Sequence, residues 1–409
     1  MRELEGIISN EEKNDRMEIE KNDKIIEDKN VKLEEEKNVK KEEEKNVKME
    51  EEKNDKMEEE KNEMIEDKNE EVNNFQENRI TKEDMSTTEK CKNVFKKICP
   101  KILEIYEIKE KIGSGSESIV YRIIYKKTNK ECAMKLIFID NDSKRNYNEF
   151  NISNRFKNQN IITFYGVYEI KKNELDCIIM EYAKFGNLKE FKQKILKREE
   201  LSEQLLCFLA YQILNGVSHL NKCKTTHFDL KPQNIIIDEY LTVKIIDFSV
   251  SIDFSKVKSK KIKLPFRGTN FYISPEVIKS KTININDLNK VDLYSLGVIL
   301  YYLAFGTYPY GLNRNDRDDY DKIYNKIENN KLEFDNEGNC YSKYFIDFLS
   351  QLLEKDINKR ININQALNNY WIKGAKILLD EKEKTFNASN FLIYLLTDHF
   401  INFDLYINN

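Results

Sequence analysis

The first part of the chain is a repeat that limits where a folded core can lie. The pair Lys-Asn recurs every eight residues, at positions 13, 21, 29, 37, 45, 53 and 61. Eight residues advance an α-helix by about 800°, so successive apolar positions are rotated by about 80° and form no coiled-coil seam. Residues 1–93 are expected to be a disordered charged segment or a solitary helix, because so few apolar side chains cannot offset the entropy cost of ordering. A docking or localising role is the alternative for this segment.

Charge and cysteine content limit the class of protein further. The net charge is −4, from 68 basic and 72 acidic residues, and it implies neither a nucleic-acid partner nor an anionic membrane surface. The seven cysteines form no CxxC pair. Reduced thiols of this kind predict a cytoplasmic protein, and a nuclear location is also open. No apolar run reaches the length of a membrane span.

The richest chemistry lies in two short runs of the second half. The first reads His-Phe-Asp-Leu-Lys-Pro-Gln-Asn from position 227, and the second reads Ile-Ile-Asp-Phe-Ser from position 245. Asp229 can accept a proton from a hydroxyl, and Lys231 carries a positive charge two residues away. Asn234 and Asp247 supply oxygen ligands of the kind that Mg²⁺ prefers. These runs resemble the catalytic loop and the metal-binding turn of the eukaryotic protein kinases.

The resemblance implies an α+β, two-lobed protein-kinase fold over residues 104–372. The N-lobe, residues 104–182, would be a small five-stranded β-sheet with one helix, and the C-lobe, residues 187–372, would be larger and helical. The charged repeat would precede this domain, and residues 373–409 would form a C-terminal extension. The pattern is similar to the serine/threonine kinases, because Lys231 stands where a tyrosine kinase typically has a nearby arginine. The subgroup resemblance is faint and points to calmodulin-kinase-kinase relatives.

The N-lobe would supply the nucleotide contacts. A glycine loop, Gly-Ser-Gly-Ser-Glu-Ser from position 113, would let backbone N–H groups approach phosphate oxygens. Lys135 ends a Cys-Ala-Met-Lys run that resembles the family's VAIK strand, so it would contact the α- and β-phosphates and pair with Glu149. The resemblance implies these nucleotide-binding residues: Gly113, Ser114, Gly115, Val120, Ala133, Lys135, Met180, Glu181, Ala183 and Ile236.

The implied reaction is transfer of the ATP γ-phosphate to protein serine or threonine hydroxyls. Asp229 would act as base, Lys231 would neutralise charge on the transferred phosphate, and Thr269 would bridge the two. Asn234 and Asp247 would hold Mg²⁺ against the triphosphate. The partners would be protein substrates rather than nucleic acid. The alternative is a pseudokinase scaffold that binds nucleotide without efficient turnover.

Three departures from the family pattern motivate that alternative: Ser118 and Ser249 replace glycines, and Phe228 replaces an arginine. The missing arginine normally meets a phosphorylated residue, yet residues 260–268 contain no serine or threonine. We therefore predict activity without phosphorylation at that position. Ser249 is expected to restrict the turn after Asp247 to fewer conformations, because serine reaches some glycine conformations only at a cost.

Other positions predict supporting contacts and substrate choice. Asp292 should anchor the backbone of the catalytic loop, and Glu276 should pair with Arg360. Arginine-directed kinases carry acidic residues at three positions that are not acidic here: Asn187, Gln233 and Tyr302. Strong selection for basic residues upstream of the phosphosite is therefore not expected.

Overall fold

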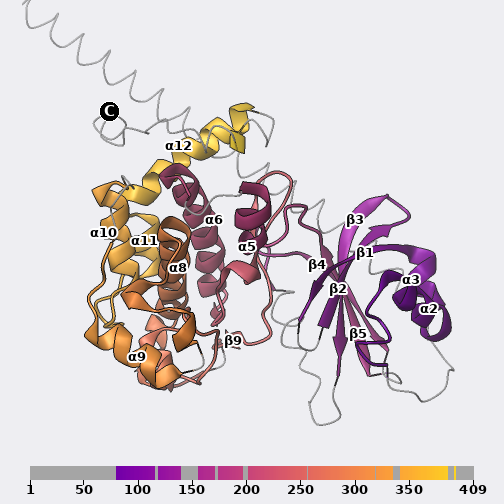
Figure 1. Ribbon diagram of the computed structural model, residues 1–409, viewed down its shortest axis with the longest axis horizontal. Helices are drawn as coiled ribbons and strands as arrows, with labels where there is room; N and C mark the ends of the chain where they lie inside the picture. Colours follow the sequence, from indigo (N-terminus) through magenta and orange to yellow (C-terminus); the bar gives the residue numbers. More distant parts are fainter. Residues whose placement is uncertain are drawn as a thin grey trace, which may run out of the picture. The chain divides into compact units, whose positions relative to one another are not determined.

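The structure of the chain, a computed structural model, describes most of the sequence from residue 80 onward. The described residues are 80–115, 118–139, 155–170, 174–196, 201–255, 257–317, 319–334, 341–385 and 391–392. Figure 1 shows a β-sheet with two helices beside it, followed along the chain by a mostly helical part. The N-lobe sheet and the helical C-lobe expected from the resemblance are thus confirmed.

The N-lobe is a five-stranded antiparallel sheet with the strand order β1-β2-β3-β5-β4. Side chains of β2 alternate between buried and half-buried, as expected for a strand with one face on a core. Strand β5 lies between β3 and β4 and is buried at every position except Glu181. The strands are β1 (Tyr106–Ser114), β2 (Ser118–Tyr125), β3 (Lys130–Phe138), β4 (Phe164–Ile170) and β5 (Leu175–Glu181).

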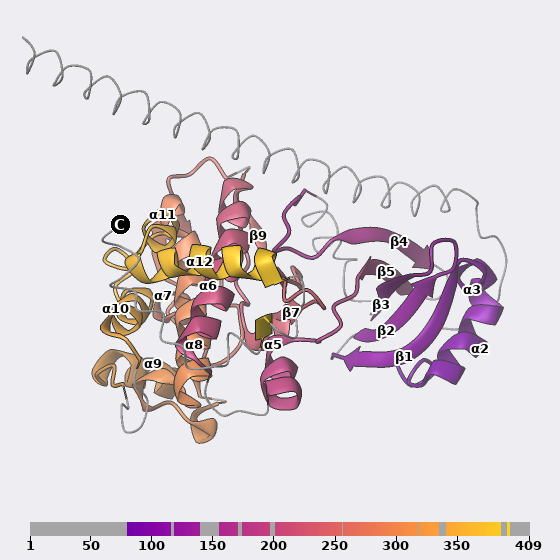
Figure 2. The same ribbon diagram turned by 90° about the horizontal axis from the view of Figure 1, so that it is seen from above.

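Two helices that the sequence analysis did not anticipate precede this sheet. They are α2 (Thr88–Ile98) and α3 (Pro100–Ile105), and both contact β1 (Figure 2). Thr87 caps α2 by accepting a hydrogen bond from the Lys90 backbone N–H at 3.3 Å. Cys91 and Phe95 are fully buried on the apolar face of α2. Residue 93, where the charged segment was expected to end, therefore falls inside a packed helix.

The residues before α2 are also tied to the sheet. The Tyr121 hydroxyl of β2 donates a hydrogen bond to the Met85 carbonyl at 2.7 Å, and both residues are buried. Lys82 donates from its ammonium group to the Gly115 carbonyl, at the end of β1. This stretch is therefore part of the N-lobe.

Replacing Tyr121 with phenylalanine is expected to lower the free energy of unfolding by about 1 kcal/mol, because the buried Met85 carbonyl loses its donor while the ring stays in place. The midpoint of denaturant unfolding, at unchanged slope, measures this loss. Tyr240→Phe is the matched control, since Tyr240 is 66% exposed. Equal stability of the two variants would show that the hydrogen bond contributes nothing.

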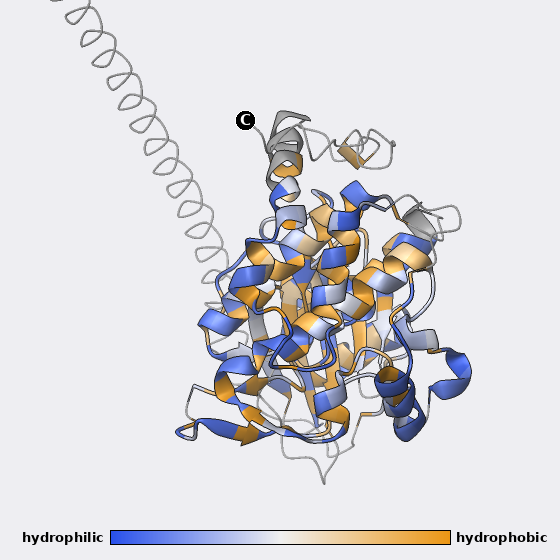
Figure 3. Ribbon diagram, turned by 90° about the vertical axis from the view of Figure 1, so that its left-hand side faces the viewer, coloured by the Kyte–Doolittle hydropathy of each residue, from blue (hydrophilic) through white to orange (hydrophobic). Residues whose placement is uncertain are grey.

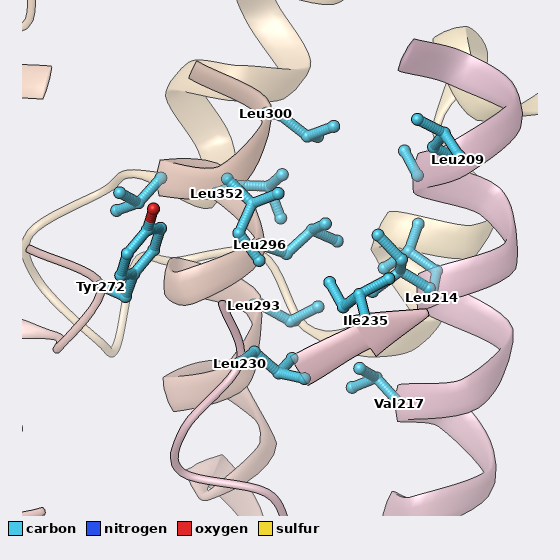
Figure 4. Packing of buried hydrophobic residues seen from close by; sticks show 14 of the residues in the cluster. Leu209, Leu214, Val217, Leu230, Ile235, Tyr272, Leu293, Leu296, Leu300 and Leu352 are labelled. Atoms are coloured by element: carbon cyan, nitrogen blue, oxygen red, sulfur yellow. The ribbon is translucent and has the colours of Figure 1, made fainter. Parts of the chain in front are cut away.

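The C-lobe is built around α6 (Glu203–Lys222) and α8 (Asn289–Phe305). Every residue of α8 except Tyr302 is buried, as expected for a helix in the centre of a core. Leucines of α6 and α8 point toward one another, with Leu230 and Ile235 between them (Figure 4). Hydrophobic segments gather among these helices, and hydrophilic segments lie on the outside (Figure 3). No helix in the described residues is long and apolar enough to cross a membrane.

The remaining helices are shorter or lie outside this central pair. The α-helices are α5 (Leu188–Glu190), α7 (Pro275–Ile278), α9 (Tyr320–Asn329), α10 (Lys343–Leu352), α11 (Ile363–Leu367) and α12 (Tyr370–Thr385). A π-helical turn, η2 (Phe191–Leu196), follows α5. The 3₁₀ turns are η3 (Pro232–Asn234), η4 (Ile285–Asp287), η5 (Pro309–Gly311) and η6 (Arg314–Asp316).

The predicted ion pair between Glu276 and Arg360 is confirmed, and it lies deep in the C-lobe. The guanidinium binds both carboxylate oxygens, Nη1 to Oε1 at 2.7 Å and Nη2 to Oε2 at 3.0 Å. Arg360 also donates to the carbonyls of Lys290 and Glu354, and it lies over the Tyr294 ring. Both charged partners are only 1% exposed.

Three two-stranded sheets position the segments that follow α6. They pair β6 (Thr225–Thr226) with β9 (Ile252–Asp253), β7 (Ile235–Ile237) with β8 (Val243–Ile245), and β10 (Lys261–Lys263) with β11 (Thr282–Asn284). Each is antiparallel; a loop alone separates β7 from β8, whereas other elements lie between the strands of the other two pairs.

Candidate active site

The loop that carries Asp229 lies between β6 and η3 and is held by a carboxylate of α8. Asp292 accepts hydrogen bonds from the backbone N–H groups of His227, at 2.8 Å, and of Phe228, at 2.9 Å. These bonds confirm the predicted anchoring role of Asp292. Burial raises the pKa of Asp292, although both hydrogen bonds favour its charged form. They also hold Phe228 at a φ of 67°, a left-handed conformation that residues other than glycine seldom adopt.

The hydrogen bonds of His227 identify its tautomer. Its Nε2 lies 2.9 Å from the Ile246 carbonyl oxygen, which can only accept. Its Nδ1 lies 3.2 Å from the Asp229 backbone N–H, which can only donate. The ring is therefore neutral, with its proton on Nε2. The His227 imidazole thus links Ile246, the residue before Asp247, to the backbone of Asp229.

Both carboxylate oxygens of Asp229 are engaged by polar side chains. The Thr269 hydroxyl donates to Oδ1 at 2.6 Å, and the Lys231 ammonium lies 2.6 Å from Oδ2. Lys231 also donates to the Thr269 hydroxyl at 2.8 Å, so the three side chains form a closed triangle. The Asp229 side chain is 12% exposed, which leaves it in contact with solvent. The structure thus brings together the side chains of Asp229, Lys231 and Thr269, as the sequence predicted.

The oxygens of Asn234 and Asp247 are suited to a hard cation. Asn234 Nδ2 donates to the Asp229 carbonyl at 2.9 Å and to Asp229 Oδ2 at 3.1 Å, so Asn234 Oδ1 is the atom left for a cation. Asp247 Oδ1 is buried and accepts no hydrogen bond within the described ranges. The Lys135 ammonium lies 3.7 Å from this oxygen, beyond hydrogen-bonding distance, so the oxygen can still accept a cation. One carboxylate and one carboxamide fit Mg²⁺, which takes few protein ligands and completes its shell with phosphate and water.

A metal held by protein side chains alone is not apparent. The part of the chain that the structure describes has no group of three or more His, Cys, Asp and Glu side chains placed to hold a metal ion. The Ile246 backbone N–H donates to the Asn234 carbonyl at 3.0 Å, so the residue before Asp247 is bonded to Asn234.

Asp247 is held in its charged form by its neighbours. Burial by itself would raise its pKa, but the charge of Lys135, 3.7 Å away, and a hydrogen bond from Ser249 outweigh burial and lower the pKa below its usual value. Ser249, which replaces a glycine of the family pattern, thus makes a polar contact with Asp247 that glycine could not make. The Asp247 backbone has a φ of 67°. The buried ring of Phe248 packs against Phe156 at a centroid distance of 5.2 Å.

The predicted nucleotide-binding residues of the sheet are cross-strand neighbours. Val120 of β2 is paired with Gly113 of β1 on one side and with Lys135 of β3 on the other. Ala133 of β3 is paired with Met180 of β5. Because paired residues lie on the same face of a sheet, Val120 and Lys135 lie on one face of the N-lobe sheet.

The residues at the ends of these strands complete the predicted set. The Gly115 backbone N–H donates to the Ser118 carbonyl at 2.9 Å and closes the glycine loop after Ser114. Ala183 follows β5 and is buried. Ile236 of β7 forms a β-bridge with Asn187. The Glu181 side chain points to Lys244, with its Oε1 2.9 Å from the ammonium, and its backbone N–H donates to the Thr163 carbonyl at 2.9 Å. Glu149, the predicted partner of Lys135, lies outside the described residues.

The contacts that hold the segment after Asp247 were not predicted from the sequence. The Arg155 guanidinium pairs with the Asp253 carboxylate of β9 at 2.7 Å and also donates to the Thr225 hydroxyl of β6. Farther along, the Arg267 guanidinium donates to the Val250 carbonyl at 3.1 Å. The pairing of β10 with β11 fixes the stretch between them. In the sequence the pair of Arg155 and Asp253 is only an arginine and an aspartate that lie far apart along the chain, and nothing in that pattern indicates a contact.

The two-lobed fold, with Asp229 and Lys231 on one loop and Asp247 beside Lys135, defines the kinase class, and comparisons with known proteins agree. The protein kinase domain family matches residues 106–372. The chain therefore belongs to the protein kinase family.

Three relatives show how far the similarity extends. The serine/threonine-protein kinase pakH of Dictyostelium discoideum is 31% identical over 273 residues, which cover 66% of this chain and 50% of that protein. Death-associated protein kinase 2 of Mus musculus is 31% identical over 308 residues, 71% of this chain and 78% of that protein. Serine/threonine-protein kinase 4 homolog B of Dictyostelium discoideum is 28% identical over 277 residues, which cover 67% of this chain and 24% of that protein. The chain thus spans half the length of the first relative and a quarter of the third.

Proposed function

We propose that the chain transfers the γ-phosphate of ATP to serine and threonine hydroxyls of protein substrates. Asp229 accepts the proton of the hydroxyl, Lys231 offsets charge on the transferred group, and Thr269 orients both side chains. Lys135 binds the nucleotide phosphates. Asn234 and Asp247 are the residues that would hold Mg²⁺, which when bound neutralises charge on the triphosphate.

The fixed carboxylate of Asp229 is the observation that carries this proposal. Its Oδ1 is bound by Thr269 at 2.6 Å, and its Oδ2 is bound by Lys231 at 2.6 Å. A general base works only when its geometry is set before the reaction, and Thr269, Lys231 and Asn234 set it here by donating to the carboxylate. A scaffold that only binds nucleotide would have no use for this arrangement.

The test is a phosphorylation assay of the full chain with a degenerate peptide library that contains serine, threonine or tyrosine. We expect magnesium-dependent incorporation of phosphate on serine and threonine but not on tyrosine. Asp247→Ala, which removes the charged cation ligand, should abolish incorporation. Tight binding of ATP by the wild-type chain without incorporation into any peptide would support the scaffold instead.

Phosphorylation after Asp247 should not be required for activity. The double variant Ser255→Ala/Ser259→Ala is expected to keep its specific activity within about twofold of the wild type, because surface substitutions change free energies by about 0.5 kcal/mol or less. The physical reason is that an ion pair to Asp253 and the β10–β11 pairing already hold this segment. Specific activity before and after phosphatase treatment is the measurement. A loss of activity in either experiment would contradict the prediction.

The location of the protein in the cell and the role of the charged repeat are also proposals. A reducing compartment, cytoplasmic or nuclear, is supported by the state of the cysteines, since the six within the described residues are free. Burial raises the pKa of the Cys91 thiol to about 12, so it stays protonated and unreactive. The repeat lies outside the described residues, and its proposed docking role is not part of the catalytic argument.

A further inference from the structure

The segment between Asp253 and Glu276 is strongly basic, although the whole chain has a net charge of −4. We call it the cationic segment. It contains no acidic residue and six basic residues: Lys256, Lys258, Lys260, Lys261, Lys263 and Arg267. Lys256 lies outside the described residues, and the other five are exposed. None of these five forms an ion pair with another described residue. Uncompensated charge of one sign on a protein surface attracts ligands of the other sign.

The backbone of the cationic segment is fixed, so these charges are displayed at defined places. Its β10 strand pairs with β11 in a register that sets Ile262 opposite the buried Ile283. Because side chains alternate along a strand, Lys261 and Lys263 project from the other face. After β10, the guanidinium of Arg267 is bound to the Val250 carbonyl.

The cationic segment leads directly into the catalytic cluster. Arg267 and Lys263 precede Thr269 by two and six residues, and the Thr269 hydroxyl contacts Asp229 at 2.6 Å. Six residues of chain span at most about 20 Å. An extended peptide of about six residues spans the same distance, so the flanks of a peptide whose hydroxyl lies at Asp229 can reach these cations.

One lysine of the cationic segment, Lys261, faces carboxylates and does not add to the excess positive charge. Lys261 lines a hollow together with Asp287, Glu354 and Asp356, and these groups offset its charge. Lys258, Lys260, Lys263 and Arg267 do not line that hollow. The excess positive charge of the segment is carried by these four residues.

We infer that the preferred substrates carry anionic residues, carboxylates or phosphates, beside the phosphorylated serine or threonine. This inference rests on the proposed function and adds a substrate class to it. Each exposed ion pair between peptide and protein contributes about 1.5- to 5-fold in binding, so three pairs together contribute about 3- to 125-fold. The preference weakens as salt rises, because exposed charges are screened. A membrane surface is less favoured as the ligand, since the cations lie on the segment that bears Thr269.

The test compares peptides that share one serine core and differ only in their flanks, which are glutamate, glutamine, lysine or phosphoserine. For the full chain we expect kcat/KM at low salt to be at least about threefold higher for glutamate than for glutamine flanks, and this ratio should approach one at 0.5 M salt. The phosphoserine peptide distinguishes the two kinds of anion. If its kcat/KM exceeds that of the glutamate peptide, the cations of the segment bind phosphate in preference to carboxylate. In Lys260→Glu/Lys263→Glu the glutamate-to-glutamine ratio should fall to one or below, and a ratio cancels any general loss of activity.

The matched control is Lys331→Glu/Lys359→Glu, which makes the same change of net charge at exposed lysines outside the segment. It should keep the wild-type ratio. Equal kcat/KM for all flanks, or a preference for lysine, would overturn the inference while leaving the kinase function intact. So would loss of binding to phosphatidylserine vesicles in Lys260→Glu/Lys263→Glu with an unchanged peptide ratio, which would assign the segment to membranes.

A binding measurement separates this inference from the proposed function. Fluorescence polarisation of the labelled glutamate and glutamine peptides needs no turnover. If no peptide is phosphorylated but the glutamate peptide binds more tightly and loses that advantage in Lys260→Glu/Lys263→Glu, the proposed function fails and the anionic-ligand surface stands. If binding of the two peptides is equal, the surface fails on its own.

Discussion

Asp229→Asn is expected to lower kcat for peptide phosphorylation by about 10²- to 10⁴-fold, the contribution of a positioned general base. The carboxamide has the same size, but its nitrogen cannot accept a proton. That nitrogen would also face the donors of Lys231, Asn234 or Thr269, since all three groups donate to the Asp229 carboxylate. Initial rates at saturating ATP and peptide measure kcat. Calorimetric titration with Mg²⁺ and ATP should show nucleotide binding close to that of the wild type.

Asp321→Asn is the matched control for this variant. It makes the same chemical change on a side chain that is 85% exposed, in a surface pair with Lys279. Its kcat should equal that of the wild type. A kcat for Asp229→Asn within about threefold of the wild type would remove Asp229 from the role of base, because a base contributes at least about 100-fold.

Arg360→Met should produce the largest loss of stability among the changes considered. Removal of one partner from a buried ion pair typically costs about 3 to 5 kcal/mol, since the remaining charge is left buried and unpaired. Here the orphaned group is the Glu276 carboxylate, together with the carbonyls of Lys290 and Glu354. The apolar stem of methionine retains much of the packing against Tyr294. Denaturant unfolding measures the loss, and the melting temperature should fall by roughly 10 °C.

Arg360→Lys tests whether charge alone is sufficient. Lysine keeps the charge but cannot form the two parallel bonds that Arg360 makes to Glu276, so an intermediate loss is expected. Asp321→Asn, which breaks an exposed pair, should leave the unfolding midpoint almost unchanged. If Arg360→Met were as stable as Asp321→Asn, the buried pair would make no net contribution to the fold.

The sequence predicted the architecture well where local pattern and spacing carry the information. The strands of the N-lobe sheet have short β-branched runs, and the helices of the C-lobe have the 3.6-residue apolar period. Asp292, Glu276 and Arg360 occupy recognisable positions, and their contacts are confirmed. Asp229, Lys231 and Thr269 were predicted to meet, although 38 residues of chain separate Lys231 from Thr269.

The features that the sequence did not predict depend on long-range pairing or on mixed composition. Helix α2 was hidden because its lysines interrupt the apolar residues, and its buried face consists only of Cys91 and Phe95. The pairing of β10 with β11 joins two three-residue strands that have helix α7 between them, so no hairpin pattern indicates it. The Ser249 contact with Asp247 follows from the geometry of the turn, whereas the sequence showed only a glycine replaced by serine.

Helices α2 and α3 have a practical consequence for work on the isolated catalytic domain. A fragment cut at residue 104, where the family-like sequence begins, would lose Phe95 and Ile102, both of which are fully buried. The outer side of β1 would then be bare, and exposed apolar patches of this kind promote self-association. A fragment that starts no later than residue 80 avoids this artefact, so kinetic comparisons among truncations should begin there.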